Sequence, residues 1–96
     1  MHLLTVDQFT GCVNETFVAQ LAEGTVDFQL VEARPLPARA PEGFRSPFSL
    51  LFRNTASVVL PQQTYRMRHA GLGDLGIFLV PVARERGGFL YQAVFA

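Results

Sequence analysis

Apolar residues recur at every second position along most of this chain, and this spacing constrains the fold more than any other feature of the sequence. In one such segment, Val26, Phe28 and Leu30 alternate with Asp27 and Gln29. A strand with one buried and one solvated face has this period. Segments of this kind, separated by turn residues, predict six strands, at residues 16–21, 25–33, 48–53, 64–69, 75–82 and 89–95.

The N-terminal segment has a different period and predicts one short helix at about residues 5–13. Thr5 and Gln8 fit a capping box, and apolar residues follow them at helical spacing. Gly11 and Asn14 are typical of a helix end. A helix of two turns is not stable by itself, so we expect this one to pack on the sheet.

Residues 34–47 form the one segment without a period, and they contain Pro35, Pro37, Pro41 and Pro47. Proline lacks a backbone donor and has a fixed φ, so we expect a long loop here rather than a strand. Long loops in small domains often have a function. We expect Phe44, the aromatic residue within the segment, to anchor the loop on the body of the protein.

Short strands joined by short turns are typical of an antiparallel sheet that curls on itself. We therefore predict a mainly β protein, a small antiparallel six-stranded barrel or sandwich with one short N-terminal helix at one end. The length of 96 residues allows a single domain over residues 1–96.

The composition excludes several classes of function. Eight basic side chains, all of them arginine, balance eight acidic ones, and this neutral charge argues against nucleic acid or a membrane surface as a partner. The sequence has no segment typical of a signal peptide or a membrane span, so we expect a cytoplasmic protein. One cysteine cannot form an internal disulfide framework, and the lack of lysine excludes Schiff-base chemistry.

The sequence contains no convincing set of catalytic or metal-binding residues. His69 and Asp74 flank a glycine-rich turn, but a catalytic zinc needs three protein ligands, so we interpret them as an exposed histidine beside a turn aspartate. Cys12 has no adjacent histidine, and we expect it to be a small buried apolar residue. We therefore predict no catalytic residue, no metal and no cofactor.

Three arginines are a further candidate site. Arg66 and Arg68 lie on one face of a predicted strand, and Arg53 ends another. Such a group could bind a phosphate or a carboxylate. Without a basic excess we favour a solvated surface whose arginines pair with acidic side chains, namely Asp27, Glu32 or Glu15.

The segment at residues 75–82 is unusual because it is apolar on both faces of the predicted strand. A strand of this kind is covered on both sides, either by the rest of the chain or by another protein. The C-terminal segment at residues 89–95 has a similar excess of apolar residues. Both interpretations stay open, and the candidate interaction surface consists of Phe44, Phe78, Val80, Val82, Phe89 and Tyr91.

An ordered set of short motifs gives the chain a family resemblance. They include Phe48-Ser49-Leu50-Leu51-Phe52-Arg53, Leu60-Pro61-Gln62, Phe78-Leu79-Val80-Pro81-Val82 and Tyr91-Gln92-Ala93-Val94-Phe95. The chain resembles the bacterial family called domain of unknown function 6916. The resemblance implies a stand-alone domain whose relatives are neighbours of phage-tail-like collar or fibre proteins, and it implies no activity, cofactor or catalytic residue. From it we expect assembly into a phage-tail-like particle.

These observations favour a non-enzymatic interaction or assembly module that binds a second copy of itself or another protein. The alternative is a small-ligand-binding β-barrel whose mouth is formed by the proline-rich loop and the turn at residues 71–74. Nine phenylalanines favour a filled interior over an open one. An enzyme is disfavoured, because no acid, base and nucleophile are seen to converge.

Overall fold

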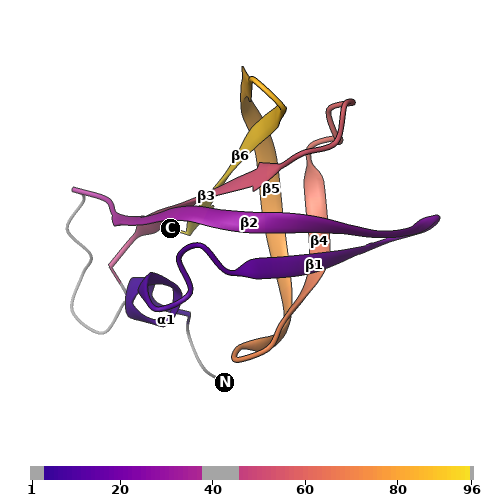
Figure 1. Ribbon diagram of the computed structural model, residues 1–96. Helices are drawn as coiled ribbons and strands as arrows, with labels where there is room; N and C mark the ends of the chain where they lie inside the picture. The colour runs from indigo at the N-terminus through magenta and orange to yellow at the C-terminus, as the bar shows by residue number, and fades with distance from the viewer. Residues whose placement is uncertain (1–3, 38–45, 96) are drawn as a thin grey trace.

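The computed structural model describes residues 4–37 and 46–95. One short helix precedes six antiparallel strands (Figure 1). The elements in chain order are α1 (Val6–Thr10), β1 (Thr16–Leu21), β2 (Gly24–Pro35), β3 (Phe48–Asn54), β4 (Gln63–His69), β5 (Gly73–Glu85) and β6 (Gly88–Phe95).

The six strands form one sheet that closes on itself. Their order around the ring is β1-β2-β3-β6-β5-β4, and β4 pairs back onto β1. This closing seam is short: Val18, Ala19 and Gln20 of β1 lie opposite Arg68, Met67 and Arg66 of β4. The predicted mainly β fold is confirmed, and one closed sheet takes the place of the two stacked sheets of a sandwich.

The helix is shorter than the sequence predicts, because it ends at Thr10 and a turn follows as far as Asn14. The capping box is present, and the Thr5 N–H donates to Gln8 Oε1 at 2.8 Å. Asn14 has a φ of 74°, a left-handed conformation that turns the chain into β1. Only Phe9 of the helix is fully buried, so α1 contributes one side chain to the end of the core.

Five of the six strands are longer than predicted, three of them by a single residue, and β2 and β5 by more. β2 continues through Arg34 to Pro35, which lies opposite Phe48, so the proline-rich loop begins later than expected. Pro35 is tolerated because it is the last residue of its strand, where one missing donor costs little. β5 continues to Glu85, opposite Gly88. Phe44, the predicted loop anchor, lies outside the described residues.

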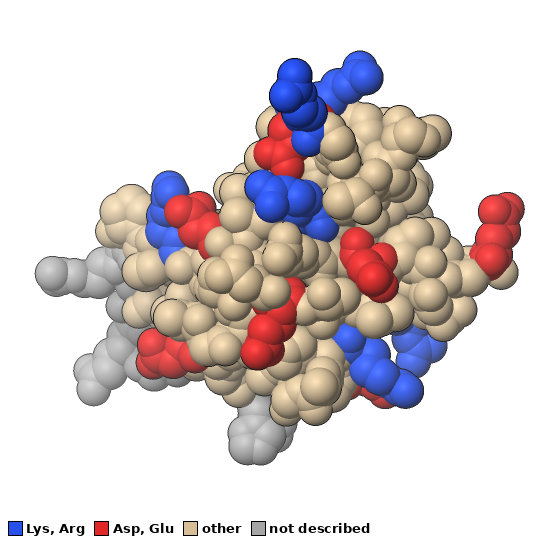
Figure 2. Space-filling view, in the orientation of Figure 1, with Lys and Arg blue, Asp and Glu red and all other residues tan. Residues whose placement is uncertain are grey.

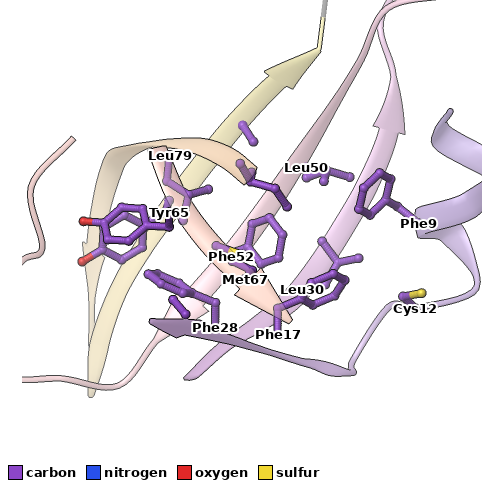
Figure 3. Close-up of a cluster of buried hydrophobic side chains, with 14 of the residues drawn as sticks. Phe9, Cys12, Phe17, Phe28, Leu30, Leu50, Phe52, Tyr65, Met67 and Leu79 are labelled. Carbon is purple, nitrogen blue, oxygen red and sulfur yellow. The ribbon is translucent and has the colours of Figure 1, made fainter. Parts of the chain in front are cut away.

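The interior of the ring is filled by large side chains (Figure 3). Phe28 lies near the centre, with ring centroids 5.2 Å from Tyr91, 5.6 Å from Tyr65 and 6.2 Å from Phe52. The buried polar groups at the ends of these rings have partners: the Tyr91 hydroxyl accepts the Leu60 N–H at 2.8 Å. This packing occupies the space in which a ligand-binding barrel would hold its ligand.

Candidate functional site

An uncharged apolar surface lies on the outside of the ring, over β5 and β6. We call it the β5–β6 face and define it by Phe78, Val80 and Val82 of β5 and Val94 of β6. Phe78 is 50% exposed, Val82 is 48% exposed and Val94 is 59% exposed, while Val80 is half-buried. On the same strand, Ile77 and Leu79 are buried inside the ring, so residues 4–37 and 46–95 cover β5 fully on its inner side only.

The sequence assigned two further residues to this surface, and the structure places them differently. Tyr91 is fully buried in the core, so its assignment to an interaction surface is wrong. Its position in the alternation of β6 explains the error, because Tyr91 and Ala93 point inward while Val94 points outward. Phe89 is half-buried, packs against the core and lies 6.0 Å from the Arg84 guanidinium. Val94, whose side chain points outward from β6, takes their place.

Three residues of the β5–β6 face lie opposite uncharged partners. Val80 lies opposite Gln92, Phe78 lies opposite Thr64, and Val94 lies opposite Ser49. A group of apolar residues with uncharged partners favours contact with another apolar surface over contact with a charged ligand.

A hollow of about 580 Å³ opens on the outer surface over β1, β2, β4 and β5, and it reaches Gly76, two residues before Phe78. Gly76 lines it and creates part of the space, because this outward position of β5 has no side chain. Arg66 of β4, opposite Gly76, lines it too, together with Arg68 and Asp74. The other lining residues are Val18, Gln20, Thr25, Met67 and Leu75. Sequence reasoning missed this hollow because β1 and β2 form it together with β4 and β5, which come much later in the sequence.

A second cluster joins the end of α1 to the end of β4. His69 is only 6% exposed, stacks on Phe17 at 4.5 Å between ring centroids, and its Nε2 lies 2.6 Å from Glu15 Oε1. Its Nδ1 accepts the backbone N–H groups of Gly71 and Leu72 at 3.0 and 3.1 Å. The expectation of an exposed histidine beside Asp74 is therefore wrong. Tyr65, Met67 and His69 are alternate residues of β4, so the His69 side chain points inward like the other two. Its hydrogen-bond partner there is Glu15.

This cluster also contains Cys12, and the ligand atoms of Cys12, Glu15 and His69 lie within 4.8 Å of one another. Three such donors are the minimum of a zinc site. The hydrogen bonds of His69 oppose this use, because Nδ1 accepts two N–H groups and the ring proton is therefore on Nε2, the nitrogen that faces the other donors. The donor set does not fit a metal, and both ring nitrogens are engaged.

The thiol in this cluster is poorly suited to nucleophilic attack. Burial raises the pKa of the Cys12 thiol above its usual value, and the nearby Glu15 carboxylate raises this pKa further. A catalytic cysteine needs the opposite, a lowered pKa that provides the thiolate. We therefore interpret the contacts among Cys12, Glu15 and His69 as structural contacts that hold α1, β1 and the turn after β4 together.

Of the three arginines considered in the sequence, Arg53 and Arg68 pair with acidic side chains other than those predicted, and Arg66 forms no ion pair within the described residues. Arg68 bonds to Asp74 at 2.9 Å, Arg34 bonds to Glu32 at 2.8 Å, and Arg53 pairs with Glu85. The Arg68 guanidinium also lowers the pKa of the Asp74 carboxyl. In the view of Figure 2, basic side chains lie close to acidic ones in several separate groups. This distribution favours the predicted solvated surface over a phosphate site.

No helix in the described parts of the chain has the length and apolar character needed to cross a membrane. Neither the curated proteins nor the solved structures contain a match to the chain. One family model does match, described as Domain of unknown function (DUF6916), and the match covers residues 4–95. The match spans nearly every residue of the ring and its helix, and we conclude that the chain belongs to the DUF6916 family.

Proposed function

We propose that this protein is a non-enzymatic interaction and assembly domain that binds another protein through the β5–β6 face. The observation that carries this proposal is the exposure of Phe78 and Val82 on β5 and of Val94 on β6, all on the outside of the ring. Single exposed apolar residues are common on proteins, but a group of them on adjacent strands is typical of an interaction site.

The position of this face in the ring supports the same function. β5 pairs with β4 through residues 73–79 and with β6 through residues 80–85, so its backbone is held by both neighbours. A partner that binds here meets side chains already fixed in place, and little conformational entropy is lost on binding. A stable interface buries about 800 Å² on each partner, so the β5–β6 face would form the centre of a larger contact.

We further propose that the assembly is a phage-tail-like particle. This part of the proposal rests on the family resemblance, in which the relatives are neighbours of tail collar and fibre proteins. The shape of the domain supports it in one respect, because a small closed ring with an apolar outer face is suited to repeated packing against other rigid subunits.

The proposal can be tested by photo-crosslinking in the cells that naturally make this protein. A photoreactive amino acid at position 78, 82 or 94 should give a crosslinked protein adduct under ultraviolet light. The matched control is position 58, because Val58 is also apolar and is 68% exposed, but lies in the loop between β3 and β4. Adducts at 58 alone, or at none of these positions, would contradict the proposal.

A further inference from the structure

We propose that the partner is a second copy of this chain, and that Phe78 of each copy inserts into the hollow beside Gly76 of the other. This inference rests on the proposed function, since it names the occupant of the same outer surface. It draws on one observation: an exposed aromatic side chain and an empty space lie next to each other on β5.

The register of the strands fixes the distance between the two features. Phe78 and Gly76 both point outward on β5, two residues apart, which corresponds to about 7 Å along a strand. A twofold axis that lies between the two facing surfaces, parallel to the sheets and across β5 at the level of Ile77, would place Phe78 of one copy over Gly76 of the other. The same operation places the second Phe78 over the first Gly76, so both contacts form together.

Shape and charge on this surface both favour a second copy over an unrelated protein. In a twofold interface each residue meets residues from the same patch, so a patch with one sign of charge would repel itself. The hollow carries both signs of charge, since Arg66 and Arg68 lie beside Asp74, and Arg68 already pairs with Asp74 at 2.9 Å. A protruding ring beside a hollow is therefore complementary to a copy of itself in shape, and the charges around it do not have the single sign that would oppose the contact.

The walls of the hollow fit an aromatic ring. Val18, which is 37% exposed, offers apolar surface. Arg66 forms no ion pair within residues 4–37 and 46–95, and its guanidinium is available to lie over the face of the inserted ring. A cation over an aromatic ring adds favourable electrostatic energy to the apolar contact.

The contact is small, so the dimer should be weak in dilute solution. Interfaces that bury less than about 1,200 Å² in total belong to transient complexes, and we expect a Kd between about 1 μM and 1 mM. Weak pairing of this kind becomes effective when copies are held close together in a larger assembly.

Sedimentation equilibrium of the purified protein, at concentrations up to about 1 mM, tests the inference. We expect reversible dimers for the unaltered chain and a Kd raised at least about tenfold by Phe78→Ala, because a central aromatic residue dominates a small interface. Val58→Ala, which removes an exposed apolar side chain elsewhere, should leave the Kd unchanged. A strict monomer, or equal effects of the two substitutions, would overturn the inference.

A second variant fills the hollow instead of removing the ring. A Cβ at Gly76 would meet only Thr64 Cγ2, at 3.6 Å, and Gly76 has no positive φ, so Gly76→Leu should fold. We expect it to prevent dimerisation as Phe78→Ala does. A mixture of the two variants should restore pairing, since one copy supplies Phe78 and the other supplies the open hollow. At the second contact the introduced leucine side chain faces the introduced alanine, which leaves room for it.

The mixture separates this inference from the proposed function. Heterodimers that form when neither variant pairs with itself would support insertion of Phe78 into the hollow. Unrestored pairing in the mixture, with both variants folded by circular dichroism, would overturn it. If the purified protein is a monomer but position 78 crosslinks to a different protein in cells, the interaction function stands and the second copy is excluded.

Discussion

The inner and outer faces of the ring carry similar apolar side chains in different surroundings. Phe28 on β2 is fully buried and contacts aromatic rings from three other strands, whereas Phe78 on β5 is half exposed and lies on the surface. Both residues are phenylalanine, and they differ in whether the side chain points into the ring or away from it. The packing on the inner face therefore determines the stability of the fold, and the apolar residues on the outer face remain available for binding.

The largest expected difference between the faces is in the free energy of unfolding. Phe28→Ala should lower it by about 3–5 kcal/mol, because the removed ring leaves a cavity among packed neighbours. Phe78→Ala should change it by less than about 0.5 kcal/mol, since no cavity is formed at the surface. Urea unfolding at low protein concentration, where the chain is monomeric, measures both. Similar losses in the free energy of unfolding for the two variants would contradict this difference between the faces.

A smaller difference in the free energy of unfolding is expected between variants of His69 and Arg68, two neighbouring residues of β4 whose side chains point to opposite faces. His69→Phe keeps the aromatic contact with Phe17 but leaves the N–H groups of Gly71 and Leu72 without their acceptor. We expect a loss of about 1–3 kcal/mol in the free energy of unfolding.

The matched control for His69 is Arg68→Gln, on the outer face, which removes the exposed pair with Asp74. Exposed ion pairs are screened by water, so this variant should unfold at the same urea concentration as the unaltered chain. If Arg68→Gln proves more destabilising than His69→Phe, the contacts of His69 at the end of β4 do not hold the fold together as described above.

Much of this architecture could be predicted from alternation alone. The six strands and the capping box follow from local patterns, because side chains on a strand change face at every residue. The error at Tyr91 has a clear physical reason: both faces of β6 are apolar, so alternation shows two rows without indicating which one points inward. Register with β3, in which Tyr91 lies opposite Phe52, settles that choice, and register is a property of the folded sheet.

The candidate sites depend even more on contacts between distant segments. His69 and Glu15 are 54 residues apart, and no local pattern pairs them. The hollow beside Gly76 is also invisible in the sequence, because β1 and β4 meet only where the ring closes. The sequence allowed either the rest of the chain or another protein to cover the apolar strand, and only the closed ring shows that Phe78 and Val82 lie exposed on its outside.

The buried thiol offers a chemical test of the inner face. Because burial and Glu15 raise the pKa of Cys12, the folded protein should react with iodoacetamide at pH 8 much more slowly than the unfolded protein. A raised pKa in the folded state means that this group stabilises the fold below the usual thiol pKa, and that its contribution is lost as the pH rises through the folded value. Rapid labelling of the folded chain, measured by mass spectrometry, would show that Cys12 is accessible.

The smallest effect is expected at Asp74 on the outer face. The Arg68 guanidinium lowers the pKa of the Asp74 carboxyl, so the midpoint of its NMR titration should lie below the usual aspartate value. With a lowered pKa, the pair contributes above the unfolded pKa of the carboxyl and is lost as the pH falls through the folded value. In Arg68→Gln the midpoint should move up toward the usual value, while Cys12 remains slow to react. An unchanged midpoint would show that the two side chains do not interact in solution. The backbone pairing of β4 and β5 would then hold this part of the outer face without the ion pair.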